Sequence, residues 1–265
     1  MKLGDSIAVI FRFLLIFLVV LSGAQTFAKV RELKTAVQDN SPSKFSSRNN
    51  NSSGICNEIL DLIASRLGDI KINGRTNGVS LGRIETMLEK SEIDFAVCLL
   101  QSEQRKKKFQ FIKVPLYSVN YVLMVKAEDD VNIANLMDIS KIQGKNTVLV
   151  HRGSVLAESL RQLPIKMNDS VRTQEQIVKM MEAGRARFLY AQDMELLSYF
   201  NDKNIAKKFR ILPQSFFKDY QYVAVTNTLD PTIKVKLEQI LLDLEKQGIL
   251  KALEAKYRKF SADGL

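Results

Sequence analysis

Apolar residues follow two patterns that alternate along the chain. Short apolar runs typical of strands lie at 33–37, 70–72, 93–100, 121–125, 146–154, 187–191 and 222–225. Between these runs, apolar residues recur at helical spacing, as they do from Ile55 to Leu67. Strands that alternate with helices of this length indicate parallel sheets with crossover helices, and therefore an α/β protein. Two such sets, one before and one after about Val125, predict two lobes.

Local signals predict the ends of several helices and one loop. Gly68, Gly184 and Gly248 each follow a helical pattern and are expected to end it. The pair Asp230-Pro231 combines a favoured N-cap residue with a proline suited to the first turn, so a long helix is expected to start there. The polar stretch at 41–54 has no apolar periodicity, which predicts a surface loop or hairpin.

The first 28 residues show the three-part pattern of a secretory signal peptide. Lys2 and Arg12 supply a positive start, residues 13–21 form an unbroken apolar run, and the Thr-Phe-Ala at 26–28 suits a peptidase. The uncharged run is much shorter than the ~20 residues that span a bilayer. We therefore expect cleavage after about Ala28 and an exported chain without a membrane anchor.

The composition argues against several kinds of chemistry. One histidine, His151, argues against a histidine-rich metal site or catalytic triad, and we expect it to be a strand residue or a pH-sensitive contact. The two cysteines, Cys56 and Cys98, are too few for a zinc ribbon; in an exported chain they are either bonded to each other or free. The net charge of +10 comes from scattered lysines, which indicates a solvated basic surface and no nucleic-acid partner.

Five segments carry a resemblance that covers essentially the whole exported chain. They are GICNEILDLIASRLG (54–68), IDFAVCLLQSEQRKKKFQFIKVPLYSVNYVLMVK (93–126), VLVHRGSVLAESL (148–160), GRARFLYAQDMELLSYF (184–200) and DLEKQGILKALEAKYRKF (243–260). Their order and spacing resemble the family 3 extracellular solute-binding proteins of bacterial amino-acid ABC transporters. The resemblance implies a two-lobed, type II periplasmic-binding-protein fold, in which each lobe is a mixed, mostly parallel sheet flanked by helices. Lobe 1 would comprise 29–121, lobe 2 would comprise 122–220, and 221–265 would return to lobe 1.

The resemblance also implies a function. The protein would be periplasmic and monomeric and would capture a small amino-acid-like or carboxylate solute between its lobes by hinge closure. It would deliver this solute to an ABC permease in the inner membrane, with no cofactor and no catalysis. Two alternatives stay open. One is a secreted dehydratase of the cyclohexadienyl-dehydratase type, for which Glu103 and Glu195 are the candidate acids; the other is an orphan sensory binding protein.

Two charged residues match the family's ligand contacts. Arg105 falls on the arginine that grips the ligand carboxylate, a role suited to the planar guanidinium fork, and the alternative is one more solvated cation. Asp193 falls on the aspartate that accepts the ligand ammonium from lobe 2, and it is also a candidate N-cap. Gly153 and Ser154 form a strand-to-helix turn that would bind a carboxylate or simply cap the helix.

Three positions depart from the family pattern. Cys98 and Leu100 stand where small hydroxyl residues are usual, and Phe45 is the one candidate for the aromatic residue that lies over the ligand. These departures indicate a ligand that is less polar, larger or otherwise different from an ordinary polar amino acid. The family placement also brings Cys56 near Cys98, and a disulfide there would fix the wall of the cleft.

Overall fold

The computed structural model describes residues 31–48, 51–76 and 78–262, so the predicted signal peptide at 1–28 lies outside the described residues. Residues from Glu32 onward form one compact unit. Among the helices in the described ranges, none is both long and apolar enough to cross a membrane.

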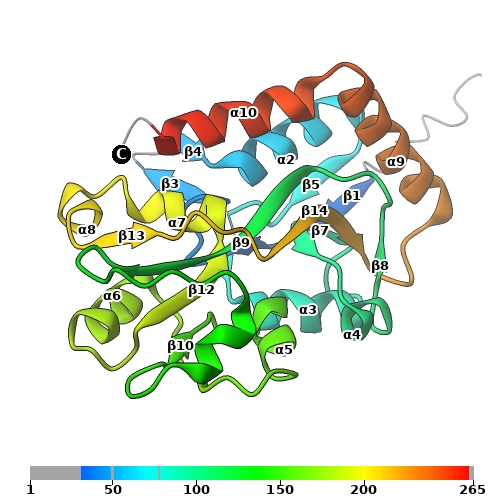
Figure 1. Ribbon diagram of the computed structural model, residues 1–265. Coiled ribbons are helices and arrows are strands. Elements are labelled where there is room, and N and C mark those ends of the chain that lie inside the picture. Colours follow the sequence, from blue (N-terminus) through cyan, green and yellow to red (C-terminus); the bar gives the residue numbers. More distant parts are fainter. Residues whose placement is uncertain (1–30, 49–50, 77, 263–265) are drawn as a thin grey trace, which may run out of the picture. The chain divides into compact units, whose positions relative to one another are not determined.

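An eight-stranded mixed sheet forms the framework (Figure 1). Its strands are β7 (Phe95–Leu100), β8 (Gln110–Phe111), β9 (Tyr117–Lys126), β10 (Val148–Leu149), β11 (Met167–Asn168), β12 (Phe188–Gln192), β13 (Phe209–Ile211) and β14 (Phe217–Val225). The main order is β11-β10-β12-β9-β14-β7, with β13 paired to β9 and β8 paired to β14. Strand β10 runs parallel to both of its neighbours, whereas every described ladder of β9 and β14 is antiparallel.

Three pairs of short strands complete the described β-structure. The first two pairs, β1 (Glu32–Lys34) with β5 (Lys71–Asn73) and β2 (Val37–Gln38) with β6 (Gly78–Val79), are parallel. The third, β3 (Ser46–Arg48) with β4 (Asn51–Ser53), is antiparallel. This last pair lies within the polar stretch at 41–54, so the predicted hairpin is confirmed.

The helices begin and end close to the predicted positions. They are α2 (Ile55–Arg66), α3 (Leu81–Glu89), α4 (Glu103–Lys106), α5 (Val155–Leu160), α6 (Gln174–Glu182), α7 (Asp193–Tyr199), α8 (Lys203–Ala206), α9 (Pro231–Lys246) and α10 (Ile249–Ala262), with a 3-10 helix at Leu136–Lys141. The Asp230 carboxylate accepts the Thr232 amide at 2.7 Å and caps α9, as predicted. Gly248 has a φ of 72° between α9 and α10, a conformation that glycine adopts at little cost.

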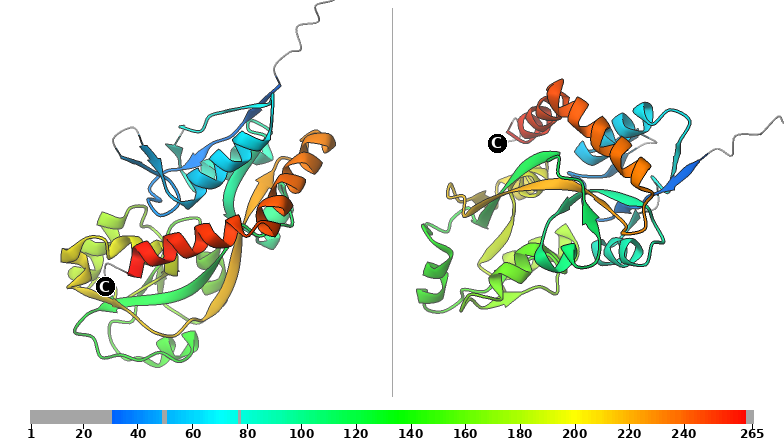
Figure 2. Two further views of the ribbon diagram at one scale, coloured as in Figure 1. Left: turned by 90° about the horizontal axis from the view of Figure 1, so that it is seen from above. Right: turned by 90° about the vertical axis from the view of Figure 1, so that its right-hand side faces the viewer.

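The two long strands β9 and β14 run side by side through the middle of the sheet. In both views of Figure 2 they are the adjacent green and orange strands, and their register pairs Phe217 with Tyr121 and Gln221 with Tyr117. Beyond this shared segment, β9 pairs with β12 and β14 pairs with β7. The predicted lobe ranges meet at Tyr121 and at Tyr220, and both residues lie in this pair of strands. The lobe boundaries themselves stay a prediction.

Candidate functional site

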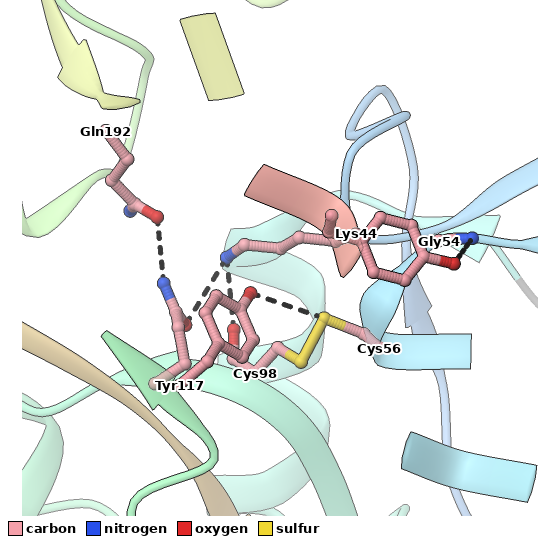
Figure 3. The surroundings of a disulfide bond; sticks show 8 residues. Lys44, Gly54, Cys56, Cys98, Tyr117 and Gln192 are labelled. Atoms are coloured by element: carbon pink, nitrogen blue, oxygen red, sulfur yellow. Dashed lines mark hydrogen bonds between the residues drawn. A yellow bond between two sulfur atoms is a disulfide. The ribbon is translucent and has the colours of Figure 1, made fainter. Parts of the chain in front are cut away.

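A β-bulge in β7 directs Cys98 toward α2. Side chains of β7 alternate between two hydrophobic clusters until Val97, but Cys98 then joins Val97 in the same cluster. The pairing of β7 with β14 shifts register here, and Cys98 has a φ of 64°. An extra residue in one strand of a pair produces this change of direction. Cys98 thereby meets Cys56 at the start of α2, and the two form a disulfide, which resolves the open alternative (Figure 3).

Lys44 reaches the bulge from the segment before β3. Its ammonium donates hydrogen bonds to the carbonyl oxygen of Cys98 (3.1 Å) and to the side-chain oxygen of Gln221 (3.5 Å). Its own carbonyl oxygen accepts the amide of Cys56 at 3.1 Å. A Cβ atom at Gly54, where φ is 110°, would lie 2.4 Å from that same oxygen. Glycine at position 54 therefore lets the Lys44 segment lie against the start of α2.

Gln221 on β14 connects Lys44 to Gln192 on β12. Its side chain has 0% exposure, and its Nε2 donates to Oε1 of Gln192 at 2.8 Å. A buried amide needs partners for both its oxygen and its nitrogen, and Gln221 has both. These hydrogen bonds form a chain from Gln192 through Gln221 and Lys44 to Cys98. Figure 3 labels Gln192, Lys44 and Cys98 in this chain. This chain joins β12, β14 and β7 to the segment before β3.

The ammonium of Lys44 lies in an unfavourable environment for a charge. Burial lowers the pKa of Lys44 from 10.5 to about 8, the negative charge of Glu195 opposes this change, and the positive charge of Arg105 adds to it. Burial disfavours the charged form because the surrounding protein solvates it less well than water does. Lys44 therefore lies within electrostatic reach of both Glu195 and Arg105.

His151 and Glu195 form an ion pair with 2.7 Å between Nε2 and Oε1, and the Tyr199 hydroxyl lies 3.4 Å from the same nitrogen. Burial alone would lower the pKa of His151, but the charge and hydrogen bond of Glu195 outweigh it and raise the pKa above 6.5. Burial would raise the pKa of Glu195, and the charges of His151 and Lys44 outweigh this and lower it. The prediction of His151 as a strand residue is wrong, because β10 ends at Leu149.

Arg105 is buried, with 4% exposure, so the alternative of a solvated cation is wrong. Its Nη2 and Nε both donate to Oε1 of Glu85 on α3, at 2.8 and 3.2 Å, and its Nη1 donates to the Leu100 carbonyl at 2.8 Å. Ser102 caps the short helix α4 that carries it. The structure therefore places Arg105 beside the end of β7 and gives it a carboxylate partner within the protein. Its contact with a solute carboxylate stays a prediction.

Asp193 faces the C-terminal helix rather than Lys44. Its carboxylate accepts hydrogen bonds from the Asn120 side chain (2.7 Å) and from Nη1 of Arg258 on α10 (2.8 Å). The alternative role of N-cap is wrong by one residue, because α7 begins at Asp193 and Gln192 occupies the cap position. Its contact with a solute ammonium stays a prediction. Among the described residues, the carboxylate of Asp193 accepts hydrogen bonds from Asn120, Met194 and Arg258, and none from Arg105.

The remaining predicted residues have clear local roles. Ser154 caps α5 by accepting the Ala157 amide at 3.3 Å, after Gly153 turns the chain with a φ of 71°. Phe45 is partly buried and packs against the main core. The Leu100 side chain is buried in the same core, so its contribution near Arg105 is its carbonyl oxygen. Contacts of these residues with a solute stay predictions.

Five ionisable residues from separate parts of the chain thus converge near the bulge, and we call them the charged cluster: Lys44, Glu85, Arg105, His151 and Glu195. Lys44, Glu85, Gln192 and Gln221 were not predicted from the sequence. The one available signal was that Lys44 is the only charged residue between Asn40 and Arg48.

Among the described residues, no group of three or more histidine, cysteine, aspartate or glutamate side chains could hold a metal ion.

Solved structures share this fold. The GluR0 ligand-binding core from Nostoc punctiforme, in complex with L-glutamate, is 21% identical, with 85% of this chain and 98% of that chain covered and a TM-score of 0.69. A putative L-cystine ABC transporter structure from Listeria monocytogenes is 18% identical, with coverages of 86% and 96% and a TM-score of 0.72. The ancestral amino-acid-binding protein AncCDT-1, a precursor of cyclohexadienyl dehydratase, is 17% identical, with coverages of 85% and 95% and a TM-score of 0.71. These likenesses confirm the predicted two-lobed, type II periplasmic-binding-protein fold.

A protein-family model also matches the chain. The model describes bacterial extracellular solute-binding proteins, family 3, and it matches residues 33–260. The matched range contains every residue of the charged cluster. None of the curated proteins compared with the chain matches it.

Proposed function

Because the chain belongs to family 3 of the bacterial extracellular solute-binding proteins, we propose that it captures a small amino-acid-like or carboxylate solute between two lobes. It then delivers this solute to the permease of an ABC importer in the inner membrane. The proposal includes lobe 1 at 29–121, lobe 2 at 122–220 and the return at 221–265. It also includes a periplasmic, monomeric protein, cleaved after about Ala28, that has no catalytic activity.

The charged cluster is the observation that carries this proposal. Lys44 and Arg105 belong to the proposed lobe 1, whereas His151 and Glu195 belong to the proposed lobe 2. The charges of Lys44 and Glu195 nevertheless act on each other strongly enough to change both pKa values. A charged solute between them would contact both lobes and would stabilise the arrangement that brings the lobes together.

A thermal-shift screen tests the proposal directly. We expect at least one amino acid or short carboxylate to raise the melting temperature, because a ligand that binds only the native state stabilises it. Calorimetry should then give a single-site affinity that Arg105→Met reduces. Arg161→Met is the matched control, since Arg161 also pairs with a carboxylate, that of Asp169, but is half exposed. A protein that no member of the screen stabilises would contradict the proposal.

The dehydratase alternative finds less support in the cluster. It needs a carboxylic acid poised to donate a proton near the working pH. Glu103 is 84% exposed and pairs with Lys106, and the pKa of Glu195 is lowered rather than raised. Both carboxyl groups are therefore ionised at neutral pH. Turnover of prephenate or arogenate by the purified protein would overturn the binding proposal.

The sensory alternative differs from the proposal only in the receiving partner. A solute-binding protein that serves an importer stimulates ATP hydrolysis by the transporter when the binding protein carries solute. A sensory binding protein does not. Reconstituting the solute-loaded protein with an amino-acid ABC transporter of the same cell would measure this stimulation. Solute binding without any stimulation would favour the sensory alternative.

A further inference from the structure

We propose that the solute carries a net negative charge and that the ammonium of Lys44 binds its carboxylate. The inference rests on the proposed function, because it names the class of solute for the same site. The supporting observation is that the nearby carboxylates each form an ion pair with a cation other than Lys44. The inference also uses the hydrogen bonds that the Lys44 ammonium donates to the Cys98 carbonyl and to the Gln221 side chain.

Each carboxylate of the charged cluster already has a cationic partner. Glu85 pairs with Arg105 at 2.8 Å, and Glu195 pairs with His151 at 2.7 Å. The candidate carboxylate Asp193 likewise pairs with a cation, that of Arg258, at 2.8 Å. A solute ammonium arriving here would find every one of these carboxylates already bonded to a cation. The arrangement therefore does not favour a solute whose charge is balanced or positive.

Lys44 differs from the other cations of the cluster. The acceptors of its two hydrogen bonds, the Cys98 carbonyl and the Gln221 side chain, are neutral. Among the described residues, no carboxylate lies within ion-pair distance of its ammonium, although Glu195 acts on it from further away. An ammonium has three N–H donors, so one N–H remains for an oxygen of the solute.

The surroundings of Lys44 make an ammonium without an anionic partner energetically unfavourable. A buried charge is stable in a protein when an opposite charge and hydrogen bonds replace the water it has lost. Here the neighbouring Arg105 adds a second positive charge, which further disfavours the ammonium. A solute carboxylate beside Lys44 would supply the missing negative charge and accept the third hydrogen bond. Lys44 thus selects for an anion.

Isosteric ligand series test the inference by calorimetry. Glutarate, L-glutamate and L-glutamine share a carbon skeleton but differ in net charge, and succinate, L-aspartate and L-asparagine form a second series. We expect the tightest ligand of the whole screen to be a net anion that binds about ten- to a hundredfold more tightly than its amide. Lys44→Met should abolish this preference, while Lys44→Arg should retain it.

Two controls keep the result interpretable. Lys179→Met removes an exposed cation that pairs with Glu175 on α6, and it should leave the preference unchanged. Lys44→Gln keeps a polar side chain at position 44, and it provides a second variant should Lys44→Met fold poorly. Both variants should be checked by thermal unfolding before binding is measured.

The outcomes separate the inference from the function on which it rests. A tightest ligand that is neutral or cationic, or a preference that survives in Lys44→Met and Lys44→Gln, would overturn the inference and leave solute binding intact. A screen in which no amino acid or carboxylate binds would overturn the proposed function and the inference together.

Discussion

Two acids on the same short helix serve two different regions. Asp193 and Glu195 lie two positions apart on α7, yet Asp193 turns to Arg258 of α10 and Glu195 turns to His151. The region around Asp193 comprises Ser118, Asn120, Asp193, Glu254 and Arg258, and we call it the helix clamp. It joins α10 to β9 and α7, whereas the charged cluster lies beside the bulge of β7.

The clamp satisfies each of its charges with an opposite one. Arg258 donates to Asp193 (2.8 Å), to Glu254 (3.0 Å) and to the Ser118 carbonyl (2.7 Å). Glu254 accepts the hydroxyl of Ser118 at 2.6 Å. Burial opposes the charge of Arg258, and its two carboxylate partners outweigh burial and raise its pKa. Such a network fixes one geometry and gives a solute no unpaired charge to bind.

The charged cluster is organised differently, because Lys44 has no carboxylate at ion-pair distance among the described residues. A group that is buried without full compensation lowers the stability of the empty protein. Natural proteins tolerate such groups mainly at functional sites. The comparison thus separates a structural network from a candidate binding site by how completely the charges are paired.

Removing the disulfide should have the largest effect on stability. The bond joins residues 42 positions apart, and replacing Cys56 and Cys98 by alanine should lower the free energy of unfolding by about 4 kcal/mol. Urea unfolding of the oxidised protein and the double variant measures this loss. We also expect weaker solute binding, because the Cys98 carbonyl that holds Lys44 lies on the bulge.

The half-exposed pair of Arg161 and Asp169 is the internal control for that experiment. The effect of Arg161→Met on the free energy of unfolding should be the same with and without the disulfide, since energetically independent sites give additive effects. A disulfide variant that unfolds at the same urea concentration as the native chain would contradict the expected role of the bond.

Breaking the clamp should have the next largest effect. Arg258→Met removes the donor to Asp193, Glu254 and Ser118, and we expect a loss of about 2 to 3 kcal/mol in the free energy of unfolding. Solute affinity should be unchanged if the clamp is purely structural. Chemical unfolding and calorimetry on the same variant measure the two quantities.

Asp193→Asn decides between the two roles of that residue. The resemblance predicts that Asp193 accepts a solute ammonium, whereas the structure pairs it with Arg258. A stability loss with normal affinity would assign Asp193 to the clamp alone. A loss of affinity in Asp193→Asn that Arg258→Met does not share would assign it to the solute site.

Local signals in the sequence were enough for much of the fold. The Asp230-Pro231 pair predicted the start of α9, and the polar stretch at 41–54 predicted the hairpin, because caps and turns depend on residues close in sequence. The apolar run at 93–100 predicted β7, which spans Phe95–Leu100. The bulge at Cys98 was not predicted, since it depends on how β7 pairs with β14, far away in the chain.

The candidate site was harder to predict from the sequence, because it also depends on contacts between segments that are far apart in the chain. Arg105 was recognised as a candidate, but its partner Glu85 lies 20 positions away on another helix. Lys44 carried no motif, and its environment arises only when the start of α2, β7 and β14 come together. Electrostatic pairing depends on distances in space, so no periodicity along the chain reports it.

The smallest expected change in stability is an increase, whereas the changes above are losses. Lys44→Met should raise the free energy of unfolding of the empty protein by about 1 to 2 kcal/mol near neutral pH, because removal of the partly buried charge outweighs the two lost hydrogen bonds. The pKa of Lys44 is about 8 when folded and near 10.5 when unfolded. Between these values the unfolded state binds more protons, so the stability of the native chain rises with pH relative to the variant.

Urea unfolding of both proteins near neutrality and at about pH 10 measures this change. The advantage of the variant should shrink as the pH rises, and saturating solute should reverse it, since the variant lacks the cation that the solute needs. Lys179→Met, whose side chain is 71% exposed, should show no such dependence. A Lys44→Met protein that is less stable than the native chain at both pH values would place Lys44 with the clamp residues, as part of the framework.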